Sequence, residues 1–460
     1  MDINELRLQI EGDVVAIADQ DYEEVRNKLV WNELKPQRRP ALIVRVSSER
    51  DVVAAVRFAR EHGLGVAVRG GGHSWVGFAL RDNSLLIDLG SLNDIRLNAD
   101  RSLVVQPAAT GREVNARLAP HGLGFPVGHC PTVPLSGFLL NGGLGWNSGG
   151  WGPACFSIRS ANVVTANGEI VVVDDHRYSD LLWAIRGGGP GFFGVVTQYE
   201  LQTYPLPKAI TTSTFFYHLD HIAAVGTRAA IAAAAMSRQT ELTMFVAPAP
   251  PEFAEQCRSS NGYIVIVSAV AFVDSSAEAA ALLGELERAL PADGCLGKQI
   301  NESATLDGLL DLGGSLWPDH HRYLADTLWS NTPPAQSLDV LRARFLHAPS
   351  RRSVAACVIR TRSATNAPAL PDAAFSMTAQ SLLLCYAVWE RAEDDATNAA
   401  WHREAIAALD RFAVGHYVGE SDIVASPSRA ERSYAPANWA RLKALRQTYD
   451  PGGLFLNQFR

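Results

Sequence analysis

The chain lacks the features that would place it in a membrane or on a nucleic acid. It has no run of about twenty apolar residues, so no segment is predicted to span a bilayer. Residues 1–15 contain acidic side chains and no continuous apolar stretch, unlike a secretory signal. The formal net charge of −7 does not provide the basic surface that nucleic acids require. We therefore expect a cytoplasmic protein with neither a membrane nor a nucleic-acid partner.

Cysteine is also scarce. Six cysteines occur among 460 residues, and their spacing suggests no pairs. They are Cys130, Cys155, Cys257, Cys295, Cys357 and Cys385. No group of Cys and His has the spacing of zinc ligands, so we expect no metal site. Without an export signal the thiols are expected to be reduced, and only Cys130 stands out, because of the residues around it.

The length and the pattern of the first part predict an α+β domain followed by a second domain. A chain of 460 residues exceeds what one compact core usually holds. Ser48 is expected to cap a helix that ends at Gly63, and Asn167-Gly168 to form a hairpin turn. The expected strands are residues 41–46, 65–68, 84–89, 102–105, 159–165, 169–173 and 195–203, and further helices are expected at 110–118 and 179–186.

The pattern changes after Pro205-Leu206-Pro207, which marks a boundary. Beyond it, strands are expected at residues 211–218, 243–248, 263–272, 354–361 and 381–389, with helices at 222–236, 276–290 and 401–412. This order predicts a mixed, largely antiparallel sheet covered by helices. The last forty residues return to the first domain. We place the first domain at 1–205, completed by 420–460, and a substrate-binding domain at 206–419.

The most distinctive stretch is Arg69-Gly70-Gly71-Gly72-His73-Ser74, which we name the first nest. Glycines without Cβ atoms let backbone N–H groups approach a bulky anion such as a pyrophosphate. A plain tight turn is the alternative for a lone triplet. The second nest, Gly128-His129-Cys130-Pro131-Thr132-Val133 together with residues 141–146, makes anion binding the better explanation. Each nest carries one nucleophilic side chain, His73 or Cys130.

Together these motifs resemble those of the vanillyl-alcohol oxidase superfamily, with its PCMH-type FAD-binding domain, and most closely its berberine-bridge-enzyme-like group. Residues 188–197 and 449–455 add to a resemblance that covers nearly the whole chain. It implies a two-domain α+β fold and an FAD bonded through its C8 methyl carbon to His73 and through C6 to Cys130. The residues that it assigns to the FAD site are Arg69, Gly70, Gly71, Gly72, His73, Ser74, Gly128, Cys130, Val133, Gly137, Asn141, Gly142, Gly143, Gly145, Trp146, Gly194, Val195, Val196 and Asn457.

The resemblance also implies a reaction. Members of the family transfer a hydride from a substrate C–H to FAD and reduce O2 to hydrogen peroxide, and a valine at position 133 leaves room for O2. Two covalent links suggest a bulky small-molecule substrate, such as an alcohol group of an oligosaccharide or another natural product of secondary metabolism. The alternatives are an amine oxidase resembling 6-hydroxy-D-nicotine oxidase, with a single His link, and a flavin-binding protein without turnover.

The chain departs from the family pattern at the catalytic base. Some members carry a Glu on a strand of the second domain facing the flavin, and Cys385 occupies that position here, so we expect Cys385 at the catalytic site beside the substrate. Others use a Tyr in a Y-x-N-Y segment, of which the stretch 417–420 keeps only Tyr417. Tyr417 is therefore the predicted base. Arg360 and Tyr386 are expected to assist, because a tyrosine with an ordinary pKa of about 10 is a weak base near neutral pH.

Overall fold

The computed structural model describes residues 3–361 and 370–457. The first part of the chain forms a four-stranded sheet in the order β1-β2-β4-β3. The strands are β1 (Asp13–Ala16), β2 (Leu42–Arg45), β3 (Val66–Arg69) and β4 (Leu85–Asp88), flanked by α1 (Ile3–Gln9), α2 (Tyr22–Lys28) and α3 (Glu49–Glu61). Ser48 caps α3 by accepting a hydrogen bond from the Asp51 N–H, as predicted. β4 lies between β2 and β3 and pairs parallel with both, and β3 runs directly into the first nest.

A second, antiparallel sheet has the order β5-β6-β10-β8-β9. Its strands are β5 (Ile95–Leu97), β6 (Leu103–Val105), β8 (Ile158–Val164), β9 (Ile170–Val173) and β10 (Val195–Leu201), while β7 (Leu123–Gly124) pairs with β11 (Tyr204–Pro205). The associated helices are α4 (Gly111–Leu118), α5 (Leu135–Leu140), α6 (Ser148–Trp151) and α7 (Ser179–Ile185). The predicted β8–β9 hairpin is confirmed, and Gly168 has the positive φ of 71° that its turn requires.

A seven-stranded antiparallel sheet follows, in the order β15-β12-β14-β13-β17-β18-β16. Its strands are β12 (Ala209–His218), β13 (Thr240–Pro248), β14 (Tyr263–Val273), β15 (Cys295–Ala304), β16 (Arg322–Ser330), β17 (Val354–Ile359) and β18 (Ser381–Trp389). The sequence did not predict the two edge strands, β15 and β16, and β15 has no fully buried residue along its length.

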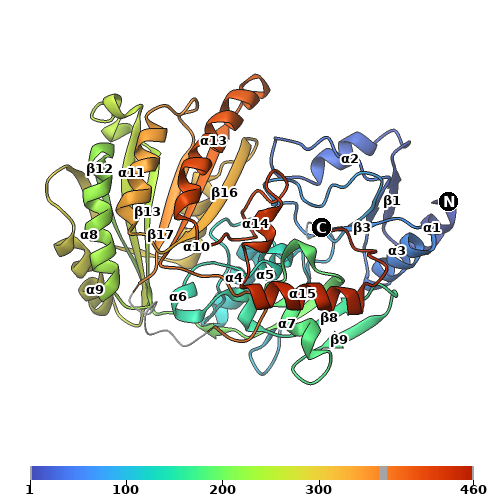
Figure 1. Cartoon of the computed structure of the whole chain (residues 1–460). Helices are drawn as coiled ribbons and strands as arrows, with labels where there is room; N and C mark the ends of the chain where they lie inside the picture. Colours follow the sequence, from blue (N-terminus) through green and yellow to red (C-terminus); the bar gives the residue numbers. More distant parts are fainter. Residues whose placement is uncertain (1–2, 362–369, 458–460) are drawn as a thin grey trace.

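Within the described residues, four helices cover one face of this sheet (Figure 1). They are α8 (Ile222–Ala235), α9 (Ser276–Ala289), α11 (Pro334–Phe345) and α13 (Asp395–Leu409). The other face turns toward the first two sheets, with α10 (Leu306–Leu316) against α4. The predicted helix-covered sheet is therefore confirmed, but its strand pairs are all antiparallel where a mixed sheet was expected. The face away from these four helices, called the uncovered face, is turned toward the rest of the protein.

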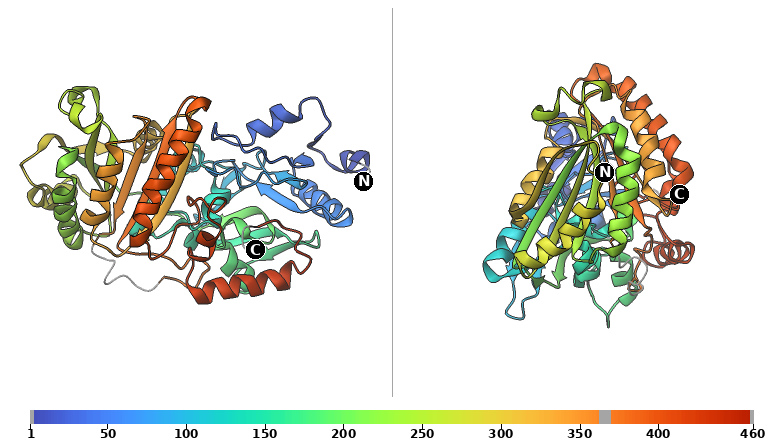
Figure 2. Two further views of the ribbon diagram at one scale, coloured as in Figure 1. Left: turned by 45° about the horizontal axis from the view of Figure 1, so that its top comes forward. Right: turned by 90° about the vertical axis from the view of Figure 1, so that its left-hand side faces the viewer.

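The C-terminal segment returns to the first part of the chain. After α14 (Ser428–Glu431), helix α15 (Pro436–Tyr449), drawn in red in Figure 2, packs against α7. Phe455 forms a bridge with Val66 at the start of β3. We propose the predicted limits of 1–205 with 420–460 and of 206–419 as the two domains. Within the stretches that the structure describes, no helix combines the length and the apolar composition needed to cross a bilayer.

Candidate active site

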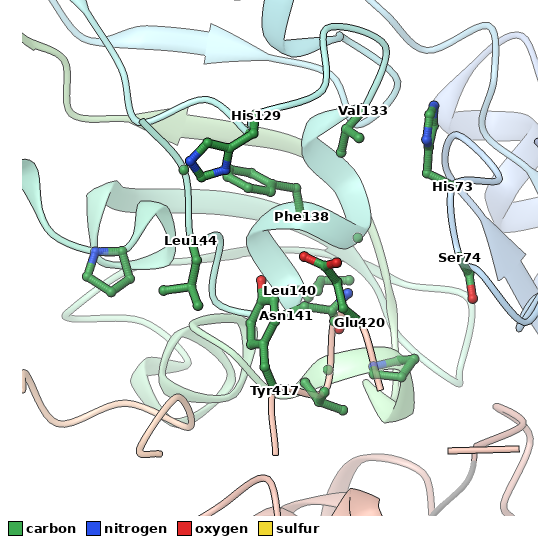
Figure 3. A pocket seen from close by; sticks show the side chains of 18 of the residues that line it. His73, Ser74, His129, Val133, Phe138, Leu140, Asn141, Leu144, Tyr417 and Glu420 are labelled. Carbon is green, nitrogen blue, oxygen red and sulfur yellow. The ribbon is translucent and has the colours of Figure 1, made fainter. Parts of the chain in front are cut away.

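A cavity of about 1010 Å³ lies between the two nests and the uncovered face of the seven-stranded sheet. Ligand pockets commonly measure about 300–1,000 Å³, so this one has room for a large ligand. The nests line one side, β13, β17 and β18 line the other, and residues 417–421 contribute a loop. Figure 3 shows His73 and His129 on opposite sides of the view, with the Glu420 carboxylate pointing into the space between them.

The three glycines of the first nest pack too closely against their neighbours to carry a side chain. A Cβ atom on Gly70 would lie 1.7 Å from Ser136 Oγ, and one on Gly71 would lie 1.8 Å from Pro134 Cγ. Gly72 has a φ of 73°. Arg69 donates hydrogen bonds to the carbonyls of Gly70 and Gly71 and forms an ion pair with Asp88 at 2.9 Å. The backbone turn is therefore fixed in place, with a guanidinium beside it.

The second nest is built in the same way. A Cβ atom on Gly145 would lie 2.2 Å from the Val127 carbonyl oxygen, which accepts a hydrogen bond from the Trp146 N–H. Gly142 and Gly143 have φ values of 109° and 74° at the turn after α5. These glycines shape the exit from α5 and do not line the cavity.

His73 is held in its neutral form. Burial, followed by the nearby Arg69 charge, lowers the pKa of His73 to about 4, and a hydrogen bond to the Thr132 backbone offsets this only in part. Its ring stacks on Trp31 at a centroid distance of 5.2 Å. A neutral imidazole has the free electron pair that nucleophilic attack requires.

Cys130 lies two residues before Thr132, but unlike His73 it is not in its nucleophilic form. Its Sγ is 3.5 Å from Thr132 Oγ1, and burial raises the pKa of the thiol despite that contact. Cys130 is therefore a thiol at neutral pH, whereas the thiolate is the nucleophilic form. The two nests thus present one side chain ready to react and one that requires deprotonation.

The side chains of β18 alternate between the two faces of the sheet. Leu384 and Tyr386 line the cavity, whereas Cys385 packs into the core beneath the helices. Burial there raises the pKa of the Cys385 thiol to about 12. The predicted place of Cys385 beside the substrate is therefore wrong, because successive residues of a strand point to opposite faces.

Tyr417, Tyr386 and Arg360 do line the cavity. Burial raises the pKa of Tyr417 far above its ordinary value, although the backbone N–H groups of Leu144 and Gly143 contact its hydroxyl. Burial lowers the pKa of Arg360, and the neighbouring Arg238 lowers it further.

Glu420 is the cavity residue that the sequence reasoning missed. The Tyr386 hydroxyl donates a hydrogen bond of 2.5 Å to Glu420 Oε2, and both side chains line the cavity. Glu420 stands where the Y-x-N-Y pattern has its second Tyr, so an acidic residue at that position was the available signal.

Most of the residues assigned to the FAD site meet at this cavity. Those that line it are Arg69, Gly70, Gly71, Gly72, His73, Ser74, Gly128, Cys130, Val133, Gly137, Asn141, Gly145, Gly194 and Val196. Gly142, Gly143, Trp146, Val195 and Asn457 lie outside its lining. The indole of Trp146 instead packs against His129, with ring centroids 4.3 Å apart.

The residues present fit a bound dinucleotide. A pyrophosphate is usually bound by the backbone N–H groups of glycines at positions that have no space for a Cβ atom. Among the described residues, Asn141 Oδ1 and the indole nitrogens of Trp317 and Trp329 are buried without a hydrogen-bond partner, and all three residues line the cavity. Buried polar atoms are normally paired, so unpaired ones along a cavity indicate a ligand.

Comparisons with known proteins agree with this fit. A family profile described as an FAD binding domain matches residues 40–174. The FAD-linked oxidoreductase ptmO of Penicillium ochrochloron is 28% identical over 432 residues, which cover 94% of this chain and 92% of the relative. The (R)-6-hydroxynicotine oxidase of Paenarthrobacter nicotinovorans is 36% identical over 202 residues, covering 44% of this chain and 43% of the relative. The solved structure of Physcomitrella patens BBE-like 1 has a TM-score of 0.84 at 18% identity, covering 100% and 98% of the two chains.

The fold and the FAD-binding domain define an FAD-linked oxidoreductase. Residues 40–174 match an FAD binding domain, and the whole chain has the fold of the solved BBE-like structure.

Proposed function

We propose that the protein is an oxidase that holds FAD covalently through His73 and Cys130 and oxidises a C–H group of an alcohol in a carbohydrate or other natural product. Bound FAD would supply the two-electron chemistry that links oxidation of the substrate to reduction of O2 to hydrogen peroxide, and the nests with His73 and Cys130 would hold it. The observation that carries the proposal is the neutral His73 imidazole at the cavity, next to a glycine nest.

The chain's own residues divide the work between the two sides of the cavity. The nests supply backbone and the two attachment residues, and Arg69 fixes the first turn. Trp75 and Trp317 pack edge-on against Tyr386 on the substrate side, at centroid distances of 5.4 and 5.5 Å. This aromatic surface suits the apolar face of a sugar ring or of a polycyclic compound, because aromatic side chains bury large apolar areas.

Denaturation tests the covalent attachment. Acid-precipitated protein should stay yellow, and its intact mass should exceed that of the chain by one FAD. Peroxide release with a panel of alcohols and oligosaccharides then tests the activity. A colourless pellet with free FAD in the supernatant would refute the covalent link, and reduction of a dye without peroxide would identify a dehydrogenase.

Amine oxidation is the second candidate, supported by one feature of the cavity. Besides Glu420, the carboxylate of Glu241 lines it, with Oε2 3.6 Å from His129 Nε2. Carboxylates beside aromatic rings also suit a cationic amine. The partial match to (R)-6-hydroxynicotine oxidase points the same way. Matched alcohol and amine substrates with the same carbon skeleton would separate the two candidates through their kcat/KM values.

A further inference from the structure

Two titratable side chains from distant parts of the chain meet at the cavity. Tyr386 stands in the middle of β18, and Glu420 lies in the loop after Tyr417. Their 2.5 Å hydrogen bond joins a strand of the seven-stranded sheet to the C-terminal segment. The Glu420 carboxylate points into the cavity (Figure 3), and a carboxylate that accepts two hydrogen bonds, here from Tyr386 and Trp75, retains further lone pairs.

The surroundings of Glu420 raise its pKa toward neutral pH, where a carboxylate is a more effective proton acceptor. Burial raises its pKa, and hydrogen bonds from Tyr386 and the Trp75 indole, together with the His129 charge, offset this only in part. Tyr417 and Cys130 also face Glu420, and its negative charge raises their pKa values. A base works best when its pKa lies close to the operating pH, so a carboxylate shifted upward is favoured over a phenol shifted upward.

We propose that Glu420 is the catalytic base of the oxidation and that Tyr386 is the positioning residue that orients its carboxylate. This proposal rests on the proposed function, because it needs a substrate with an O–H or N–H group next to the oxidised carbon. It replaces the sequence-based hypothesis that Tyr417 is the base.

The proton step balances within the substrate and Glu420. The substrate O–H bond breaks, an O–H bond forms on the carboxylate, and the electron pair stays on the substrate oxygen. The hydride of the neighbouring carbon leaves to the two-electron oxidant of the proposed function. Glu420 must be ionised to accept the proton, so activity is lost as the pH falls through its raised pKa.

The neighbouring candidates are less suitable. The Tyr417 hydroxyl contacts the backbone N–H groups of Gly143 and Leu144, and burial raises its pKa. The Tyr386 hydroxyl already donates a hydrogen bond to Glu420, and this bond together with the Glu420 charge raises the pKa of Tyr386 further. Cys385 lies outside the cavity lining.

Replacement of the carboxylate tests the base. Glu420→Gln keeps the size of the side chain and an oxygen that accepts from Tyr386. The holoenzyme should retain its full FAD content, while substrate-driven bleaching of the flavin absorbance without oxygen should slow by about 10²–10⁴-fold. Tyr417→Phe should slow it by less than about tenfold. If Glu420→Gln bleaches at the wild-type rate, or Tyr417→Phe is the slower variant, the assignment is overturned.

A titration without turnover provides a second readout. Infrared difference spectra of the holoenzyme across pH should show one carboxyl C=O band that is absent in Glu420→Gln. Tyr386→Phe removes a donor that stabilises the carboxylate, so the midpoint should move to higher pH. Glu241→Gln, which removes the other cavity carboxylate, should keep the band. A band that persists in Glu420→Gln, or a midpoint that falls in Tyr386→Phe, would overturn the proposal.

This titration also distinguishes a wrong oxidase assignment from a wrong assignment of the base. If no substrate yields peroxide while the Glu420 band behaves as described, the oxidase assignment fails. The raised pKa of Glu420 and its dependence on Tyr386 then still hold. If peroxide is released normally by Glu420→Gln, the oxidase assignment stands and the base is elsewhere.

Discussion

The two walls of the cavity differ in composition: one is rich in glycine backbone and the other is formed by the side chains of a sheet. The wall of the nests, called the backbone wall, is built around glycines such as Gly70 and Gly145, which leave no space for a Cβ atom, and it also carries the side chains of His73, Cys130 and Val133. The wall of the seven-stranded sheet consists of side chains that alternate with strand period, such as Leu384 and Tyr386. The first wall suits a cofactor common to a family, because backbone binding depends little on side-chain identity. The second suits whichever substrate the side chains select.

The largest effect is expected where a side chain is added to the backbone wall. Gly70→Ala places a methyl group 1.7 Å from Ser136 Oγ and 2.5 Å from Ser136 Cβ, so the turn must shift. We expect the purified protein to lose most of its FAD, measured as flavin absorbance per chain. Gly452→Ala is the control, because nothing lies within 4 Å of a Cβ atom there. Full FAD content in Gly70→Ala would show that the nest tolerates side chains.

The next effect concerns the two nucleophiles of that wall. His73→Ala and Cys130→Ala should each retain attached FAD through the other residue, and the double variant should release all of it on denaturation. Because the pKa of Cys130 is raised, attachment in His73→Ala should become faster as the pH increases, whereas Cys130→Ala should attach FAD even at mildly acidic pH. Mass spectrometry of denatured protein after incubation with FAD measures both. Unchanged retention and an unchanged absorption spectrum in Cys130→Ala would indicate a single link.

Sequence reasoning succeeded on the backbone wall because its signals are local. A strand followed by three glycines, as at residues 66–72, can be read without knowing its neighbours. The cap at Ser48 and the turn at Gly168 are local for the same reason. The strand β15 was missed because an exposed edge strand has no apolar pattern of its own, and its place is set by pairing with β12.

The side-chain wall could be predicted only in part. Whether residue 385 or residue 386 faces the cavity depends on which face of β18 the helices cover, and that is a tertiary property. The pair of Tyr386 and Glu420 joins residues 34 positions apart in sequence, and no local pattern encodes that contact. The sequence identified Tyr417 because the resemblance carried it and Tyr386 because it neighbours the matched position 385, and it passed over Glu420 because the resemblance assigned no role to that position.

A smaller effect is expected from Val133→Ile. Val133 lines the cavity on the backbone wall, where the resemblance reserves space for O2. One added methylene in a tight pocket changes a rate by roughly tenfold at the lower end of the usual range. We expect slower flavin reoxidation by air, followed by stopped-flow absorbance, with anaerobic reduction by substrate nearly unchanged. If the wild-type protein itself reoxidises no faster than free flavin, Val133 does not serve oxygen access and the protein is a dehydrogenase.

The smallest effect on the reaction is expected at Cys385, the neighbour of the cavity residue Tyr386. Cys385→Ser places a hydroxyl in the apolar core beneath the helices, on the face of β18 opposite Tyr386. A buried hydroxyl without a partner costs about 1–3 kcal/mol, so the midpoint of urea denaturation should fall. The rate of flavin reduction should stay within about twofold of wild type, because the thiol does not line the cavity and its pKa of about 12 keeps it protonated. A variant that folds with unchanged stability but reduces its flavin a hundredfold more slowly would mean that Cys385 reaches the substrate, and that the two faces of the sheet have been assigned the wrong way round.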